Sequence, residues 1–308
     1  FAPSPTGDLH LGSAATALVA WLCARAAGGQ LLVRSEDLDR PRSVAGAEQR
    51  QLDDLRWLGL DWDEGPDRGG PAGPYRQSER RAAYDAAIDR LTALGHTFAC
   101  DCSRREIAQI ASAPHTGDDG PPYPGTCRDR QMRTAWRRPP AVRLRVEPAP
   151  VRVHDALQPP YEEDVAAVVG DLVLRRGDGV HAYQLAVVVD DLAMGVTEVV
   201  RGADLLSSTA RQTLIARLLG AALPPTLHIP LVVAPDGRRL SKRTGAVSLR
   251  DKRQLGVAPD AVVGALACAL GLQADDTPIT PRALLASFDR ARLINRPTIA
   301  LPAALLGA

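Results

Sequence analysis

The segment formed by residues 3–13, which reads PSPTGDLHLGS, constrains the fold more than any other part of the sequence. Its two prolines and two glycines predict a rigid turn that can lie close to a ligand. Ser13 can cap the helix that follows, and the start of that helix offers free N–H groups and the positive end of a dipole. His10 adds a donor for phosphate oxygens, and Gly12 leaves room for an adenine or a ribose. The segment favours a phosphate-binding turn over a merely capped helix after a proline-rich loop.

The spacing of apolar residues predicts an α/β chain around this turn. Helices are expected over residues 13–27, 45–58, 80–94, 207–219, 259–270 and 281–289. Strands are expected over residues 1–8, 29–39, 170–179 and 182–191. Between residues 98 and 160, stretches rich in glycine and proline predict an insertion of short strands and loops. Because a strand, a helix and a strand follow one another near the start of the chain, a parallel sheet is favoured.

A second candidate motif, residues 236–246, contains Leu-Ser-Lys-Arg at positions 240–243. Lys242 and Lys252 are the only lysines in the sequence, against 35 arginines. A lysine on a loop can follow the charge that builds on a triphosphate when its α-phosphorus is attacked. A solvated basic turn is the plainer interpretation, but arginine is bulky and planar and does not freely replace lysine in a tight phosphate contact. The motif therefore favours a phosphate-contacting loop, whereas Lys252 has no assigned role.

These two motifs resemble the two signatures of class I aminoacyl-tRNA synthetases. Residues 3–13 are similar to the first signature, often called HIGH, in its glutamyl form, with Ser13 at the last position. The Leu-Ser-Lys-Arg motif is similar to the KMSKS loop, with Arg239 in place of its first lysine. The resemblance implies a Rossmann-like catalytic domain of the α/β class, split by a zinc-containing insertion and followed by a mostly helical portion. It implies catalytic roles for His10 and Lys242. The implied site for ATP and Mg²⁺ consists of His10, Gly12, Ser13, Leu240, Ser241, Lys242 and Arg243.

Four further residues match the glutamyl branch and are the expected glutamate ligands: Ser4, Glu36, Tyr183 and Arg201. Glu36 ends an expected strand, where α/β sheets bind ligands, and the resemblance gives it the substrate's ammonium group. Tyr183 is also expected at a strand. An arginine can hold a carboxylate with two hydrogen bonds, so Arg201 favours glutamate over glutamine. Singly, each residue could instead be a surface acid, a core aromatic or a surface ion pair. In this family an arginine precedes the Phe-Ala-Pro-Ser string, a position just before Phe1.

The candidate ligands of a structural zinc ion are Cys100, Cys102, Tyr123 and Cys127. Thiolates are good zinc ligands, and a structural zinc takes four ligands. The fourth could be Tyr123, His115 or Asp101. Tyr123 is favoured because it lies four residues before Cys127 on a Pro-Gly turn, although the metal must then lower a phenol pKa of about 10. Three reduced, buried thiols are the alternative.

The resemblance also implies how the chain is divided into domains. Residues 1–97 and 176–230 are expected to form the two halves of the Rossmann-like domain, around an acceptor-type insertion at residues 98–175 that carries the zinc. Residues 231–308 are expected to hold the Leu-Ser-Lys-Arg loop and a helical stem-contact region. About 65 residues follow that loop, too few for an anticodon-binding domain. Length, the YQLAVVVDD string and the cysteine spacing are similar to a short subfamily, which activates glutamate with ATP and transfers it to queuosine in the anticodon of tRNA-Asp.

The composition excludes several other classes of protein. A net charge of +1 among 308 residues excludes a polybasic nucleic-acid coat and an acidic disordered chain. No apolar run reaches the roughly 18 residues of a membrane span, and no signal peptide is present, so a cytoplasmic monomer is expected. The alternatives are a truncated glutamyl-tRNA synthetase that charges tRNA-Glu, a small nucleotidyltransferase, and a synthetase-like binding module without catalysis.

Overall fold

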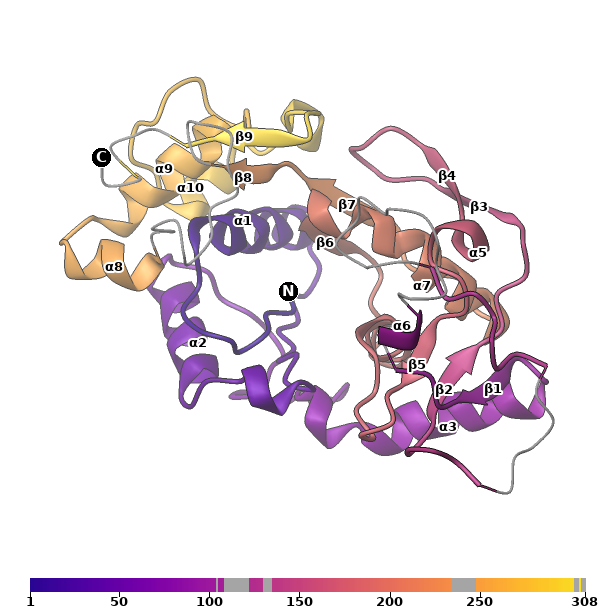
Figure 1. Ribbon diagram of the computed structural model, residues 1–308. Coiled ribbons are helices and arrows are strands. Elements are labelled where there is room, and N and C mark those ends of the chain that lie inside the picture. Colours follow the sequence, from indigo (N-terminus) through magenta and orange to yellow (C-terminus); the bar gives the residue numbers. More distant parts are fainter. Residues whose placement is uncertain (104, 108–121, 130–134, 234–247, 302–304, 306–308) are drawn as a thin grey trace.

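The computed structural model describes the chain apart from residues 104, 108–121, 130–134, 234–247, 302–304 and 306–308 (Figure 1). Helices and strands are mixed along the described residues, as the sequence predicts. They enclose two main hydrophobic cores, one around the N-terminal helix and one around the inserted strands. Among the described residues, no helix is both long and apolar enough to cross a membrane.

The first core surrounds α1 (Leu11–Ala26), which has ten buried residues out of sixteen. A helix that is apolar on nearly all sides must be enclosed by other elements. β6 (Val199–Gly202), β8 (Leu231–Val233), α9 (Pro259–Ala269) and α10 (Pro281–Leu285) pack against it. Figure 1 shows α1 below β8, α9 and α10, with β6 at its right-hand end and the N-terminus nearby.

Four short strands beside α1 form two separate parallel pairs. β6 pairs with β7 (Thr226–Ile229), and β8 pairs with β9 (Thr298–Ala300). α7 (Leu206–Leu218) connects β6 to β7, so these elements form the strand–helix–strand unit that a parallel pair requires. The prediction of a parallel sheet rested on the strands near the start of the chain, and those residues form no regular ladder; the parallel pairs lie later in the chain.

The strand expected over residues 29–39 is present as an extended segment without a regular ladder. On one side, the N–H of Arg34 donates to the carbonyl of Phe1 and that of Glu36 to the carbonyl of Pro3, both at 3.0 Å. On its other side the segment makes only isolated parallel bridges. Because Pro3 has no N–H to return, the ladder is interrupted, and the strand expected at the N-terminus is interrupted for the same reason.

Most of the expected helices are confirmed. Those not yet given are α2 (Ala47–Trp57) and α3 (Arg81–Ala93). α10 is shorter than expected, because it ends before residue 286. α8 (Leu249–Gln254) was not expected; the Ser248 hydroxyl and the Asp251 carboxylate form a capping box at its start. Short 3₁₀ turns lie at η1 (Arg40–Arg42), η2 (Gln77–Glu79), η3 (Ala203–Leu205) and η5 (Arg290–Arg292).

The insertion consists of short strands, as expected. β1 (Thr97–Cys100), β2 (Ala141–Leu144) and β5 (Val173–Arg175) form an antiparallel sheet in the order β1-β2-β5. β3 (Pro150–Val153) pairs with β4 (Tyr161–Asp164), and the short helix α5 (Val165–Val168) follows. Their apolar side chains form the second core together with α3, α6 and α7, on the side of the molecule away from α8 (Figure 1).

α6 (Tyr183–Ala193) corrects the strand expected over residues 182–191. The run Ala-Val-Val-Val is apolar and β-branched, which is typical of a buried strand but cannot be distinguished from a buried helix by pattern alone. Tertiary packing decides here, because the segment packs against both α3 and α7 and buries four consecutive residues. Tyr183 is therefore the first residue of a helix and does not lie on a strand.

Candidate functional site

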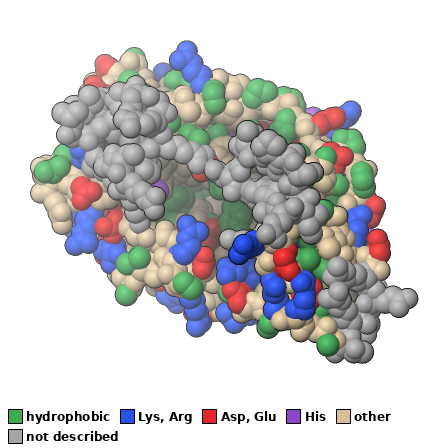
Figure 2. Space-filling view, in the orientation of Figure 1, with side chains coloured by type: hydrophobic (Ala, Val, Ile, Leu, Met, Phe, Trp, Pro, Cys, Tyr) green, Lys and Arg blue, Asp and Glu red, His purple; other side chains and the backbone are tan. Residues whose placement is uncertain are grey.

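A cavity of about 1250 Å³ opens at the N-terminus of α1. The first turn, the extended segment 31–36, α6 and β6 contribute to its lining. The expected site residues that line it are Ser4, His10, Gly12, Ser13, Glu36, Tyr183 and Arg201. Leu240, Ser241, Lys242 and Arg243 lie outside the described residues. Figure 2 shows a hollow near the middle of this face, with hydrophobic side chains in it and charged side chains along one rim.

The first turn leads into α1 earlier than expected, because the helix begins at Leu11. His10 is the N-cap residue, its backbone is extended, and its side chain makes no capping hydrogen bond. The hydroxyl of Ser13 lies 3.1 Å from His10 Nδ1, inside the first helical turn. The expected cap by Ser13 is therefore wrong. The N-cap side chain thus leaves the first N–H groups of α1 uncapped beside the cavity, which suits an anion at a helix N-terminus.

Gly12 has room for a side chain within the protein itself. Among the described residues, a Cβ atom at this position would meet only Cβ of Val232, at an ordinary 3.8 Å. Packing against this part of the chain therefore does not require glycine here, and Gly12 lines the cavity. Val232 is in β8, and Ser248 forms an isolated antiparallel bridge with His10. The elements on either side of residues 234–247 thus both adjoin the first turn.

Glu36 is one of three carboxylates around Arg34. Arg34 Nη1 lies 2.7 Å from Asp191 Oδ1, its Nη2 lies 3.5 Å from Glu36 Oε1, and its Nε lies 3.6 Å from Asp190 Oδ2. Burial raises the pKa of Glu36 to about 7, although Arg34 opposes the increase. Glu36 can therefore present a negative charge to an ammonium group only from near-neutral pH upwards.

Asp190 of α6 forms hydrogen bonds with residues in and just before α3. Its fully buried carboxylate accepts hydrogen bonds from Arg80 Nε at 2.6 Å, Gln77 Nε2 at 2.8 Å and Tyr84 Oη at 2.9 Å. The sequence interpretation missed this network, together with Arg34. One feature of the sequence could have indicated the network. Asp190 and Asp191 follow the apolar run of α6, and buried carboxylates require partners.

Arg201 is 8% exposed and contacts three neutral groups. It donates from Nε to His228 Nε2, from Nη1 to Gln212 Oε1 and from Nη2 to Thr209 Oγ1, each at 2.8 Å. Within the described parts of the chain, no carboxylate forms an ion pair with it. Burial raises the pKa of the Tyr183 hydroxyl, which stays protonated near Glu36. The cavity is therefore lined both by the acidic region around Glu36 and by Arg201, whose charge no carboxylate of the described residues neutralises.

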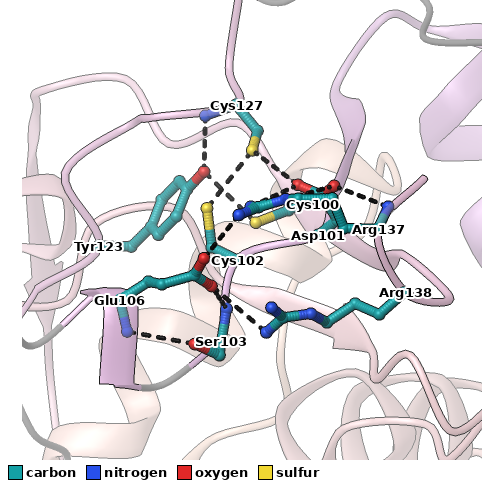
Figure 3. A network of polar contacts seen from close by, with 9 residues as sticks. All are labelled: Cys100, Asp101, Cys102, Ser103, Glu106, Tyr123, Cys127, Arg137 and Arg138. Atoms are coloured by element: carbon teal, nitrogen blue, oxygen red, sulfur yellow. Dashed lines mark hydrogen bonds and ion pairs between the residues drawn. The ribbon is translucent and has the colours of Figure 1, made fainter. Parts of the chain in front are cut away.

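The three expected cysteine ligands bring their sulfur atoms within 4.8 Å of one another (Figure 3). The sulfurs of Cys102 and Cys127 lie 3.5 Å apart, and Tyr123 Oη lies 3.4 Å from the Cys100 sulfur. Ligands at about 2.0–2.3 Å from a tetrahedral zinc ion lie about 3.3–3.8 Å from one another. The Cys102–Cys127 and Cys100–Tyr123 pairs therefore each have the separation expected of two ligands on one zinc ion.

The other candidates for the fourth metal ligand differ from Tyr123. Asp101 is buried, but Arg137 binds both of its carboxylate oxygens at 3.2 Å (Figure 3). His115 lies outside the described residues. Arg143 stacks on the ring of Tyr123, with Cζ 3.8 Å from the ring centroid. This stacking holds the phenol beside the cysteines and favours Tyr123 as the fourth ligand.

Comparisons with known proteins agree with this arrangement. The family model of class I tRNA synthetases (E and Q), catalytic domain, matches residues 1–297. The chain belongs to this family. It is 49% identical to the Glutamyl-Q tRNA(Asp) synthetase of Symbiobacterium thermophilum, over 100% of this chain and 97% of that protein. It is 53% identical to the protein of the same name from Nocardia farcinica, over 97% of this chain and 91% of that one.

A solved structure supports the fold. The Glutamate-tRNA Synthetase from Elizabethkingia anophelis superimposes with a TM-score of 0.85 at 27% identity, and the match covers 99% of this chain and 68% of that one. The mixed helix and strand architecture and the membership of the chain in the class I synthetase family are therefore confirmed.

Proposed function

We propose that this chain activates L-glutamate with ATP and transfers the glutamyl group to queuosine in the anticodon of tRNA-Asp. The cavity is the main support for this proposal. It combines Glu36 for an ammonium group, Arg201 for a carboxylate and the start of α1 for a phosphate. The names of the two relatives, which match over nearly their whole length, support the choice of tRNA-Asp.

In the first step, the α-carboxylate of glutamate attacks the α-phosphorus of ATP in line, and the bond to pyrophosphate breaks. The reaction needs no side chain as nucleophile, so the protein acts by positioning and by electrostatic stabilisation. N–H groups at the start of α1, His10 and Lys242 hold the charge that develops on the pyrophosphate. Mg²⁺ on the triphosphate would neutralise part of that charge. The glutamyl group then passes from the adenylate to queuosine, and AMP leaves.

We assign the residues as follows. Glu36 receives the ammonium group, Arg201 holds the side-chain carboxylate, and Ser4 and Tyr183 complete the glutamate site. The assigned ATP contacts are His10, Gly12, Ser13, Leu240, Ser241, Lys242 and Arg243. This assignment is supported by the shared cavity for the described members. For residues 240–243 it is supported by the position of β8 and Ser248 beside the first turn.

The remaining assignments concern architecture. Cys100, Cys102, Tyr123 and Cys127 would hold a structural zinc ion, which would tie the end of β1 to the turn before residue 127. We propose a Rossmann-like domain made of residues 1–97 and 176–230, an acceptor-type insertion at 98–175, and the Lys242 loop with a helical portion at 231–308. We further propose that the protein acts as a monomer in the cytoplasm.

Glutamate-dependent exchange of pyrophosphate into ATP, measured without tRNA, tests the activation step. The wild type should catalyse exchange, and Lys242→Ala should abolish it while calorimetry still detects glutamate binding. If none of the twenty amino acids supports exchange by the wild type, the enzyme assignment is wrong.

Transfer of labelled glutamate to RNA tests the second step. We expect transfer to tRNA-Asp that contains queuosine and none to the same tRNA without it. Charging of tRNA-Glu would instead favour the second candidate function, a glutamyl-tRNA synthetase, which the name of the superimposed structure suggests.

A further inference from the structure

A chain of buried side chains leads from Asp155 through His228 to Arg201. His228 Nδ1 lies 2.6 Å from Asp155 Oδ2, and His228 Nε2 lies 2.8 Å from Arg201 Nε. The side chains of Asp155 and His228 have no exposed surface. Asp155 follows β3 of the insertion, His228 is in β7, and Arg201 is in the neighbouring strand β6. Three segments that are distant in sequence therefore converge behind one cavity-lining arginine.

Asp155 is an ionised carboxylate with a full set of partners. It accepts hydrogen bonds from the backbone N–H groups of Leu157, Gln158 and His228, from the Thr226 hydroxyl and from the His228 ring. Burial alone would raise the pKa of Asp155, but the hydrogen bond from His228 and those from the backbone outweigh it and hold the pKa well below its usual range. Asp155 therefore acts only as an acceptor.

The donor and acceptor pattern fixes the tautomer of His228. Since Asp155 accepts, Nδ1 must carry the hydrogen, and since arginine has no acceptor, Nε2 must offer its lone pair. The imidazole is therefore neutral, and burial lowers its pKa. A second proton on Nε2 would point at the N–H of Arg201 Nε and break the contact.

This arrangement leaves the charge of Arg201 available to a ligand. A carboxylate bonded directly to Arg201 would neutralise it, whereas a neutral imidazole orients it without doing so. Arg201 uses three of its five N–H donors on His228, Gln212 and Thr209, and two donors remain.

We propose that Asp155 and His228 are positioning residues that select glutamate, because Asp155 sets the tautomer with which His228 orients Arg201 toward a ligand carboxylate. The inference rests on the proposed function, in which Arg201 holds the side chain of glutamate. It assigns two residues to specificity that do not themselves line the cavity.

Three variants test the proposal by ATP–pyrophosphate exchange. Asp155→Asn keeps the shape of the carboxylate but presents an amide donor to Nδ1, which reverses the tautomer of His228. We expect the KM for glutamate to rise about 10- to 100-fold, the KM for ATP to stay within about twofold, and the preference for glutamate over glutamine to fall about tenfold or more. His228→Asn can still donate to Asp155 but cannot accept from Arg201, and it should behave like Asp155→Asn. His228→Gln can accept from Arg201 and should recover much of the glutamate affinity.

A purely structural role predicts a different pattern. If Asp155→Asn and His228→Asn lower the melting temperature but leave the KM for glutamate and the preference over glutamine unchanged, the proposal is wrong. It is equally wrong if His228→Gln and His228→Asn have equal glutamate KM values.

The tautomer can be tested independently of activity. ¹⁵N NMR of the wild-type imidazole should show His228 neutral and protonated at Nδ1, and protonation at Nε2 would overturn the proposal. A wild type without glutamate-dependent exchange would refute the proposed function, whereas the NMR experiment would still decide the tautomer.

Discussion

The proposed glutamate-binding end and the proposed nucleotide-binding end of the cavity differ in the kind of protein group that would bind the ligand. At the glutamate end, buried side chains from distant segments bind one another, as Arg34 does with Asp191 and Arg201 with His228. At the nucleotide end, the backbone provides the site through the uncapped start of α1 and the space at Gly12. In the proposed site, amino-acid recognition would thus depend on the assembled tertiary structure, whereas phosphate recognition would depend on a local turn.

The glutamate end itself contains two buried arginines with opposite surroundings. Arg34 is surrounded by Glu36, Asp190 and Asp191, so its charge is already matched. Arg201 contacts only neutral groups among the described residues. A carboxylate ligand is therefore directed to Arg201, while Arg34 holds Glu36 and α6 in place.

Among variants of the described cavity residues, Arg201→Gln should give the largest effect on activity. We expect kcat/KM for glutamate to fall about 10³-fold, or about 4 kcal/mol, because a ligand carboxylate loses its cation. The melting temperature should change little, since glutamine can still donate to neighbouring groups. Exchange kinetics measure the effect, and Arg201→Lys, which keeps the charge without the fork, should be intermediate. An unchanged glutamate KM in Arg201→Gln would remove this residue from the site.

Arg34→Gln should instead reduce stability. Removing the cation leaves Asp190 and Asp191 as buried charges without it, at a cost of about 3–4 kcal/mol in the free energy of unfolding. Urea unfolding measures this loss. The control is Arg152→Gln, which breaks the exposed ion pair with Glu162 and should cost less than about 1 kcal/mol. Equal losses in the two variants would contradict the contrast between the arginines.

Glu36→Gln should stabilise the protein in a pH-dependent way. Burial raises the pKa of Glu36 from its ordinary value of 4.5 to about 7 in the folded protein. Its contribution to stability is therefore fully present below pH 4.5 and is lost as the pH rises through 7. At pH 8 the variant should be more stable than the wild type by about 3 kcal/mol, and at pH 4.5 the difference should nearly vanish.

Glutamate binding should depend on pH with the opposite sign, because the ammonium group needs ionised Glu36. The wild-type KM for glutamate should rise as the pH falls below 7, and this dependence should be absent from Glu36→Gln. Unfolding and exchange at pH 6 and pH 8 test both signs. A constant stability difference across this range would show that Glu36 is already ionised at pH 6.

Gly12→Ala tests the nucleotide end and should have the smallest effect. Of the residues that the structure describes, the added Cβ meets only Val232, at 3.8 Å, so folding should change little, while the KM for ATP should rise about tenfold, or about 1.4 kcal/mol. Gly264→Ala is the control, because its Cβ would lie 2.3 Å from the carbonyl of Thr277 and should impair folding. A normal KM for ATP in Gly12→Ala would mean that no ligand approaches this residue.

The sequence predicted best where structure is local. Residues 3–13 form a turn before a helix, and His10 and Gly12 line the cavity, because the prolines restrict the backbone there and the glycines allow conformations that other residues avoid. The cap by Ser13 was mispredicted because α1 begins two residues before position 13.

The sequence predicted least where distant segments decide the structure. The apolar run of α6 has strand-like composition, and only its packing between α3 and α7 selects the helix. Asp155 and His228 are 73 residues apart, so no local pattern could indicate their contact. The regular strand expected at 29–39 failed because its neighbour Pro3 lacks an N–H.

The buried carboxylate of Asp190 has a consequence for how the protein folds. Its partners lie 106 to 113 residues earlier in the chain, and the contact between Arg34 and Asp191 spans 157 residues. Contacts of this length repay the entropy of loop closure only after the intervening insertion is in place. The ammonium side of the pocket should therefore be completed late in folding, and glutamate binding should report on the docking of both halves of the chain.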